Sequence, residues 1–165
     1  MECCLMVTAI KGNATSTFGG NVDVTGNVIT DALAFSAYSS GSQSISNATN
    51  TKVTYDVEDY DTGSCFSSSR FTPTVAGYYN IYAYFSFIAA SGLNQIQIYK
   101  NGSQYKVVAS GNSSSGYANQ INQQIYLNGT TDYVEVYIYQ NSGGSANITG
   151  GQSSSAFQGY LARSV

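Results

Sequence analysis

The chain has 165 residues, of which charged residues are only 9%, against about 25% in an average soluble domain. Its formal net charge of −3, with six Lys and Arg residues, excludes a basic surface of the kind that neutralises nucleic-acid phosphates. Apolar residues at 42% and aromatic residues at 13% can form a core, so charge-driven disorder does not fit and one folded domain is expected. No apolar run approaches the ~18 residues of a membrane-spanning helix, so we predict no membrane partner.

The first 31 residues differ from the rest and contain a small internal echo. Gly-Asn-Val begins at Gly20 and again at Gly26, each time followed by a short β-branched alternation. Two short strands cannot bury themselves alone, so they either pair with another chain or form a peripheral hairpin of the main domain. We predict that residues 1–31 form an N-terminal β arm or short stalk and that residues 32–165 form the head domain.

The first part of the head shows short alternating segments joined by polar ones. Phe35 and Val53 are apolar residues at alternating positions that we expect to face the core. Asp and Gly favour a turn at DTGS, and Pro73 places its segment at a sheet edge because Pro cannot donate to a strand ladder. The predicted elements are strands at 32–39, 52–57 and 71–75, a polar loop at 40–51 and a turn at 61–64.

The most aromatic stretch alternates from Tyr79 to Phe87. One face carries residues 79, 81, 83, 85 and 87, and the other carries residues 78, 80, 82, 84 and 86. A period of two over nine residues predicts an extended strand, because successive side chains point to opposite faces of a sheet. Both faces carry large rings, so we expect a central strand whose second face is covered by another sheet or another subunit.

The remaining segments alternate in the same way and are separated by turn signals. Asn101-Gly102 and Asn128-Gly129 are strong signals for hairpin turns. Strands are predicted at 94–100, 104–110, 121–127, 132–140 and 156–161, with Gly/Ser-rich loops at 111–116 and 141–154. No segment has a helical period, and about eight to ten short strands at regular spacing indicate an all-β sandwich or jelly roll.

Catalytic chemistry has little support in the sequence. The chain contains no His, which removes the commonest general base and transition-metal ligand. No carboxylate pair is singled out for glycoside hydrolysis, and no phosphate-binding Gly-rich motif opens a helix. We therefore predict a protein that is not an enzyme and needs no cofactor. Cys3, Cys4 and Cys65 make an odd count with two adjacent members, which favours three free thiols over a disulfide framework.

One series of spaced residues has the order of a known signature: Tyr55, Asp61, Phe66, Phe71, Gly77 and Tyr79, then Phe157, Gly159 and Tyr160 near the C-terminus. This series resembles the globular head of complement 1q, in the tumour-necrosis-factor-like jelly-roll superfamily. The resemblance covers about residues 32–165 and implies an antiparallel jelly-roll β-sandwich that assembles as a homotrimer. Tyr55 stands where Phe is usual, the Phe66–Phe71 spacing is two residues short, and Ile81 and Ala83 replace two later aromatic residues.

Within that superfamily, the segments YDTG and FTPTVAGYY, preceded by GNVDVTGNVITD, resemble the versions found in bacteriophage virion proteins. The resemblance implies a structural protein on the surface of a virion. Two functions follow from it. The first is a trimeric capsid decoration (cement) protein anchored to the major capsid protein by its N-terminal arm, which the shortness of residues 1–31 favours. The second is the receptor-binding head of a short tail or head fibre, which contacts a host glycan or protein.

Five tyrosines are the candidates for the trimer interface: Tyr82, Tyr84, Tyr133, Tyr137 and Tyr139. They are expected on strand faces opposite the core, and an aromatic stripe of that size rarely stays wet on a soluble monomer. Burial of one such ring is worth roughly 1.5 to 3 kcal/mol, so several around a threefold axis suffice for association. The alternative is that these rings cover the core from the second sheet or stand singly in solvent.

Two further features have competing interpretations. Asp56, Glu58, Asp59 and Asp61 are oxygen donors of the kind that Ca²⁺ prefers, but they lack the spacing of a calcium loop, so a solvated segment with a turn-forming Asp61 is favoured and no metal is predicted. The Ser/Gly/Asn-rich loops at 40–50, 110–119 and 141–154 suit adaptable recognition of protein or sugar, and equally suit simple solvated linkers.

Overall fold

A computed structural model describes residues 32–86, 92–110 and 118–165. The predicted N-terminal arm, the predicted loop at 111–116 and Phe87 lie outside these residues. Every regular element in the described part of the chain is a β-strand, which confirms the all-β prediction. In the same residues, no helix is long and apolar enough to cross a membrane. The strands are β1 Ala34–Tyr38, β2 Gln43–Ile45, β3 Thr51–Lys52, β4 Val57–Asp61, β5 Phe66–Ser67, β6 Arg70–Phe71, β7 Gly77–Ser86, β8 Asn94–Lys100, β9 Ser103–Ser110, β10 Ala118–Leu127, β11 Val134–Gln140, β12 Ala146–Ile148 and β13 Ser155–Ser164.

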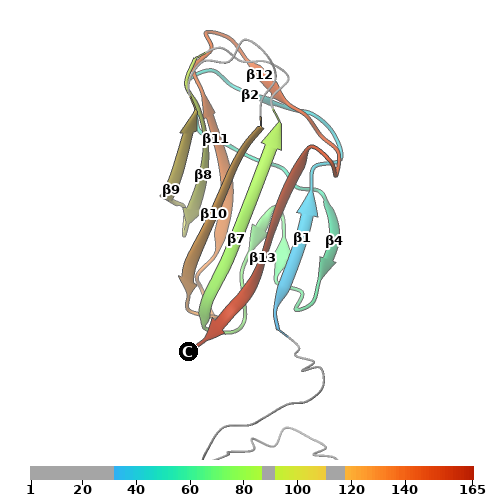
Figure 1. Cartoon of the computed structure of the whole chain (residues 1–165), viewed down its shortest axis with the longest axis vertical. Helices are drawn as coiled ribbons and strands as arrows, with labels where there is room; N and C mark the ends of the chain where they lie inside the picture. The colour runs from blue at the N-terminus through green and yellow to red at the C-terminus, as the bar shows by residue number, and fades with distance from the viewer. Residues whose placement is uncertain (1–31, 87–91, 111–117) are drawn as a thin grey trace, which may run out of the picture. The chain divides into compact units, whose positions relative to one another are not determined.

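Two antiparallel sheets pack face to face (Figure 1). The first, which we call the front sheet, has the strand order β10-β7-β13-β1-β4. The second, the back sheet, has the order β5-β6-β11-β8-β9, and β3 pairs with β11 outside that path. A small sheet of β2 and β12 lies at the upper end of the sandwich in Figure 1. Neighbouring strands far apart in sequence are characteristic of a jelly roll, so the predicted fold is confirmed.

Strand β7 has the alternation that the sequence predicts. Tyr79, Ile81, Ala83 and Phe85 are buried, whereas the residues between them are partly or largely exposed. The strand lies between β10 and β13, so both of its edges are paired, as expected of a central strand. Because the period of a strand is two, the burial of one row fixes the other row on the outer face of the front sheet.

A cluster of aromatic rings joins the two sheets. The Phe35 ring of β1 stacks on Phe71 at 4.3 Å and on Phe66 at 5.1 Å, both from the back sheet. Phe157 of β13 meets Phe35 edge-on at 4.9 Å, and Tyr55 packs against Phe157 at 5.4 Å. Contacts of this kind add about 0.5–1.5 kcal/mol per pair to the gain from burial. The aromatic members of the signature therefore form the core, with the exception of Tyr160, which is exposed on the outer face.

The other signature residues shape the backbone. The Asp61 carboxylate accepts hydrogen bonds from the N–H groups of Gly63 at 3.3 Å and Phe66 at 2.7 Å, which confirms it as the turn-forming carboxylate. A Cβ atom on Gly77 would collide with the backbone of Arg163, and one on Gly159 would lie 2.7 Å from Ile81 Cδ1 and 2.9 Å from the carbonyl oxygen of Asn80. Both glycines therefore permit a close approach within the front sheet.

The prediction of one strand at 52–57 was wrong. The chain crosses there from the back sheet to the front sheet, so no single ladder can hold the whole segment. The N–H of Val53 donates to Val136 of the back sheet at 2.9 Å, and the N–H of Asp56 donates to Tyr38 of the front sheet at 3.1 Å. Residues 53–56 form the crossing, with Val53 and Tyr55 buried between the sheets.

Two other boundaries also differ from expectation. The predicted edge strand at 71–75 is reduced to Arg70–Phe71, because Pro73 has no N–H to continue the ladder. The predicted loops at 40–51 and 141–154 contain β2 and β12, which pair with each other through Ala146↔Ile45 and Ile148↔Gln43. Each of these strands has only three residues, too few for a periodic signal in the sequence.

Replacement of Gly159 by Ala is expected to destabilise the fold by about 1–3 kcal/mol, because the new methyl group overpacks the contact with Ile81 and Asn80. Gly144→Ala is the matched control, since a Cβ atom there meets nothing within 4 Å. Denaturant unfolding at one fixed chain concentration measures both variants. Equal stability of the two variants would contradict the tight approach of β13 to β7.

Candidate interaction surfaces

The outer face of the front sheet consists of tyrosines and amides. The rows that β7, β10 and β13 turn outward carry no charged residue from Tyr78 to Tyr84, from Gln120 to Tyr126, or from Gln158 to Tyr160. Interfaces are depleted in Lys, Glu and Asp and enriched in Tyr, whereas an ordinary wet surface is rich in charge. We call this surface the tyrosine face; its members are Tyr78, Asn80, Tyr82, Tyr84, Gln120, Asn122, Gln124, Tyr126, Gln158 and Tyr160.

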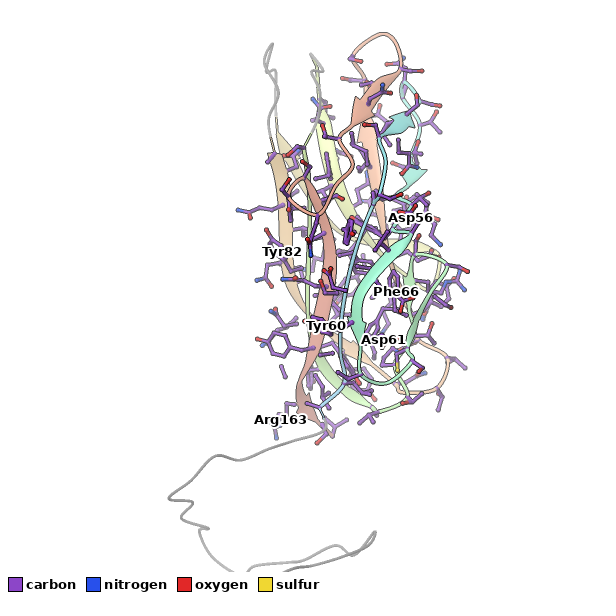
Figure 2. All side chains as sticks on the ribbon, turned by 90° about the vertical axis from the view of Figure 1, so that its right-hand side faces the viewer. Asp56, Tyr60, Asp61, Phe66, Tyr82 and Arg163 are labelled. Carbon is purple, nitrogen blue, oxygen red and sulfur yellow. The ribbon has the colours of Figure 1, made fainter. Side chains whose placement is uncertain are left out.

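Hydrogen bonds fix part of this surface. The Tyr82 hydroxyl donates to Gln120 Oε1 at 3.1 Å, and the Tyr84 hydroxyl donates to the carbonyl of Gln152 at 3.1 Å. The two rings lie 6.0 Å apart. Partial desolvation, reinforced by Tyr82, raises the pKa of Tyr84, so the Tyr84 hydroxyl acts as a neutral hydrogen-bond donor. Figure 2 shows Tyr82 on the side of the sheet away from Phe66, which lies in the core.

The lower end of the tyrosine face is more exposed. Tyr78 and Tyr126 are 45% and 41% exposed, and their rings lie 5.6 Å apart. Tyr160 is 52% exposed, although the signature includes it. A shallow groove of about 350 Å³ opens beside Tyr78 and is lined by Gln124, Ala162 and Arg163 as well. Large apolar rings are thus left uncovered in one chain.

The structure does not bring the five predicted interface tyrosines together. Tyr137 and Tyr139 lie on β11 of the back sheet, and Tyr133 immediately precedes that strand. Their alternation was predicted correctly, but the outer faces of the two sheets point in opposite directions. The back-sheet tyrosines have partners within the chain: the Tyr137 ring stacks on Tyr99 at 4.0 Å, and the Arg70 guanidinium lies 3.8 Å over the Tyr133 ring.

A buried carboxylate lies among those back-sheet tyrosines. Glu135 is 3% exposed, and its Oε1 accepts hydrogen bonds from Lys52 Nζ at 2.7 Å and Arg70 Nε at 2.9 Å. Burial acts to raise the pKa of Glu135, but the hydrogen bonds and charges of Lys52 and Arg70 outweigh it and hold that pKa below its ordinary value. The alternation in the sequence places Glu135 on one face of its strand. It gives no indication of the ion-pair partners of Glu135, which come from β3 and β6.

The carboxylates of the acidic segment, residues 56–61, accept hydrogen bonds from neighbouring segments. Asp56 accepts hydrogen bonds from Ser40, and Asp59 accepts them from the Ser36 hydroxyl at 2.9 Å and Gln152 Nε2 at 2.8 Å. Glu58 is exposed. Figure 2 shows Asp56 and Asp61 at opposite ends of β4. Among the described residues, no group of three or more His, Cys, Asp and Glu side chains is placed to hold a metal ion.

Cys65 is a free thiol and is buried beside the turn. Its Sγ lies 3.3 Å from the carbonyl oxygen of Gly63. This agrees with the prediction for Cys65, whereas Cys3 and Cys4 lie outside the described residues.

Strand β9 forms one edge of the back sheet and is exposed along its length. Residues 103–109 are all exposed, including Tyr105 at 44%, Val107 at 42% and Val108 at 41%. Adjacent valines interrupt the alternation, which is a sign in the sequence that this strand has no single inward face. Its partner β8 covers one edge only. An exposed apolar edge strand is a template for contact with another chain.

An open recess, which we call the hydroxyl recess, lies beside the predicted recognition loop at 40–50. Its volume is about 390 Å³, and it is lined by residues 39–44 together with Thr54 and Asp56. The sequence predicts recognition or a solvated linker for the loops at 40–50 and 141–154. The structure shows that β2 and β12 give them a fixed support. Most of the third predicted recognition loop, 110–119, lies outside the described residues.

Comparison with known proteins identifies the fold and leaves the function open. No protein-family model matches the sequence, and no curated protein matches it. Solved structures do: the globular domain of zebrafish complement 1qA, at 16% identity and a TM-score of 0.62, covers 81% of this chain and 99% of its own. The Eiger tumour necrosis factor of S. frugiperda, at 10% identity and a TM-score of 0.65, covers 81% and 94%. The PRD1 vertex protein P5, at 19% identity and a TM-score of 0.57, covers 83% and 100%. The chain therefore has the complement 1q/tumour-necrosis-factor-like jelly-roll fold.

Glu135→Gln is expected to lower the free energy of unfolding at neutral pH by about 1–3 kcal/mol, because two cations lose their shared carboxylate. The loss stays below that of a fully buried pair, since the side chains of Lys52 and Arg70 are 32% and 42% exposed. The pKa of Glu135 is lower in the folded state than in the unfolded state. The stabilisation by its ion pairs is therefore complete above the unfolded-state pKa of about 4.3 and is lost as the pH falls through the folded-state pKa.

Denaturant unfolding at neutral pH and at about pH 3 measures this difference, which is expected to shrink in acid. Glu58→Gln is the control, because Glu58 is exposed and makes no ion pair within the described residues. A Glu135→Gln effect that is independent of pH would contradict the assignment.

Proposed function

We propose that this chain is a non-enzymatic structural protein of a virion that assembles as a homotrimer. In this proposal residues 32–165 form the head, and residues 1–31 form an arm that anchors it to the major capsid protein as a capsid decoration protein. The main observation in support of assembly is the uncharged tyrosine face. The virion location is supported by the resemblance of the sequence to bacteriophage virion heads and by the shared fold with a vertex protein.

A ring of three identical chains needs two different surfaces on each chain, because head-to-tail contacts do not use the same patch twice. The described residues offer two such surfaces. One is the tyrosine face, which is the outer face of the front sheet. The other is the adjoining side of the sandwich, where the edge strand β9 of the back sheet and the edge strand β10 of the front sheet meet. Tyr105, Val107 and Val108 supply uncovered apolar area on that second surface. We infer that the β9–β10 side of one chain packs on the tyrosine face of the next.

This arrangement narrows the interface predicted from the sequence. Tyr82 and Tyr84 belong to the tyrosine face, whereas Tyr137 and Tyr139 belong to the opposite face of the sandwich and have partners or neighbours there. A flat contact cannot cover both sets in one pair of chains. We therefore propose Tyr82 and Tyr84 for the interface, together with Tyr126 and Tyr160.

The positions of the chain ends support an anchored head. Strand β1 begins at the lower end of the sandwich in Figure 1, where β13 also ends. The N–H of Leu161 donates to the carbonyl of Leu33 at 2.8 Å, so the start of the head lies against the last strand. The β2–β12 sheet lies at the other end, and residues 39–42 connect the end of β1 to it. An anchor that precedes residue 32 would thus leave the hydroxyl recess, whose Asp56 lies about midway along the head in Figure 2, away from the anchored end.

The same geometry favours the second candidate function, the receptor-binding head of a short tail or head fibre. A head carried on a stalk presents its far end to a host surface. The supporting observation is the hydroxyl recess, which lies away from the anchored end and whose hydroxyl-rich lining is held by hydrogen bonds. Recognition and decoration differ in copy number, since a shell offers many equivalent positions and a fibre few.

Tyr82→Lys combined with Tyr84→Lys is expected to convert a trimer into a monomer. Loss of each interface tyrosine costs about 2 kcal/mol or more, so the double variant is expected to lose about 4 kcal/mol, or on the order of 1,000-fold in affinity, at each of the three interfaces. Light scattering at micromolar concentration measures the mass. The matched control is Tyr137→Lys combined with Tyr139→Lys, which is expected to remain trimeric. A wild-type chain that is monomeric under these conditions would sink the trimer proposal.

On purified virus particles from the source of this chain, cryo-electron microscopy and quantitative mass spectrometry are expected to find the protein on the capsid in hundreds of copies. That result follows if trimers occupy the symmetric positions of the shell. A few dozen copies at the tip of a fibre would replace decoration by the fibre-head function. Absence from the particle would overturn both.

A further inference from the structure

The hydroxyl recess has a lining of unusual uniformity. Residues 39–44, Thr54 and Asp56 surround it, and among them only Asp56 is ionisable. The hydroxyl groups come from Ser39, Ser40, Ser42, Ser44 and Thr54. No Lys, Arg or apolar side chain larger than hydrogen or a Thr methyl group lines it. Such a wall offers a ligand many hydrogen-bonding groups and no large apolar side chain.

The floor of the recess is held by hydrogen bonds within the chain. Gln43 Oε1 accepts from the N–H of Thr54 at 2.9 Å, and its Nε2 donates to the carbonyl of Lys52 at 2.8 Å. The Ser39 hydroxyl donates to the carbonyl of Thr54 at 2.5 Å. These contacts join the segment after β1 to the segment before β4. The lining is therefore positioned before any ligand binds, which reduces the entropic cost of binding.

Asp56 is held in place by Ser40. The N–H of Ser40 donates to Asp56 Oδ1 at 2.7 Å, and the Ser40 hydroxyl donates to Asp56 Oδ2 at 2.5 Å. The hydroxyl bond first, and the backbone bond second, hold the pKa of Asp56 below its ordinary value, so the group is a carboxylate at neutral pH. Each of its oxygens still has a lone pair for a second donor.

Two hydroxyl groups of the recess are available to a ligand. Ser42 and Ser44 are exposed, and in the described part of the chain their hydroxyls make no hydrogen bond. A hydroxyl both donates and accepts, whereas the Asp56 carboxylate only accepts. Adjacent hydroxyl groups on one molecule satisfy this combination, because they donate to the carboxylate and exchange hydrogen bonds with the serines. A phosphate, sulfate or carboxylate ligand would be repelled by Asp56 and would find no cation.

We propose that the hydroxyl recess binds a neutral polyhydroxylated ligand, namely one sugar unit of a surface glycan, with Asp56, Ser42 and Ser44 as the contacting residues. The recess volume of about 390 Å³ lies near the lower end of the range of small-molecule sites, which suits a ligand of that size. This site deepens the fibre-head candidate, but its chemistry is independent of where the protein sits on a particle.

Weak binding by each chain is part of the proposal. A pyranose has about twelve heavy atoms, and without an aromatic surface to stack on, its Kd is on the order of 1 mM. Three such recesses on one trimer would bind a multivalent glycan more tightly by effective concentration. That gain rests on the proposed trimer, whereas binding of a single sugar does not.

Gly41 and Gly144 provide a matched pair of blocking variants. A Cβ atom at either position meets nothing within 4 Å, and neither residue has a left-handed φ, so the fold accepts a side chain at both. Gly41 lines the recess and Gly144 does not. Gly41→Trp is therefore expected to fill the recess, and Gly144→Trp to leave it open. Asp56→Asn removes the charge while it keeps an acceptor for Ser40.

The test is a titration of the ¹⁵N-labelled full chain with methyl glycosides of glucose, galactose and mannose and with N-acetylglucosamine, each to about 50 mM, far above the expected Kd. Amide shifts of Gly41, Ser42 and Ser44 are the readout, with β9 amides as the reference. At least one neutral sugar is expected to give saturable shifts confined to the recess. Gly41→Trp and Asp56→Asn are expected to weaken binding at least ~10-fold, and Gly144→Trp to leave it unchanged.

Three outcomes would overturn the proposal. The first is the absence of saturable recess shifts with every neutral sugar. The second is equal binding by Gly41→Trp and Gly144→Trp when thermal melting shows both folded. The third is a response only to glucosamine or glucuronate, each titrated in the same way as a charged comparison, which would make the recess a site for a charged ligand. Because the titration is done in solution, its failure leaves the particle location of the protein to be decided separately by electron microscopy.

Discussion

The stacking of Phe35 on Phe71 and Phe66 is the contact on which the rest of the structure depends. It joins the front sheet to the back sheet at 4.3 and 5.1 Å, and Phe157 closes the cluster edge-on. All four rings are buried, and each is worth roughly 1.5–3 kcal/mol of burial. No ion pair replaces this contribution, because the chain has few charges. In the described residues the two buried carboxylates, Asp132 and Glu135, pair with Lys100 and with Lys52 and Arg70, which all lie on strands of the back sheet.

Because side chains alternate along each strand, this core packing also decides which residues face outward. With Tyr79, Ile81 and Phe85 facing the ring cluster, Tyr82 and Tyr84 must face outward, because a shift by one residue would exchange the two rows. The position of the tyrosine face is thus a consequence of core packing. Its composition is not: a sheet that merely faced water would be stable with Lys, Glu or Thr in the same places. Tyrosines and amides there are therefore the stronger indication of assembly.

The connection to the preceding chain, the proposed assembly surfaces and the hydroxyl recess lie on different parts of the head. The described head begins at one end, the tyrosine face and the β9 side are the surfaces proposed for assembly, and the hydroxyl recess lies away from the end where the head begins. Contacts by rings, amides and hydroxyl groups depend only weakly on ionic strength, since screening acts on charges. Assembly through such contacts, as proposed above, would therefore depend little on the salt concentration. The same low charge leaves recognition to hydrogen bonds.

Local alternation and turn chemistry were enough to predict the strands with a long period-two pattern and the residues that need a special backbone geometry. Strand β7, the β8–β9 hairpin at Asn101-Gly102 and the turn-forming role of Asp61 follow from local alternation and turn chemistry. Tertiary structure decided which sheet each strand joins. Residues 52–57 alternate like one strand yet cross between sheets, and Tyr137 shares the pattern of Tyr82 yet faces the opposite way. The pairing of β2 with β12, and with it the recess beside Asp56, also came only from the fold. These features depend on contacts between segments about a hundred residues apart, and no local pattern encodes which distant strand will be the neighbour.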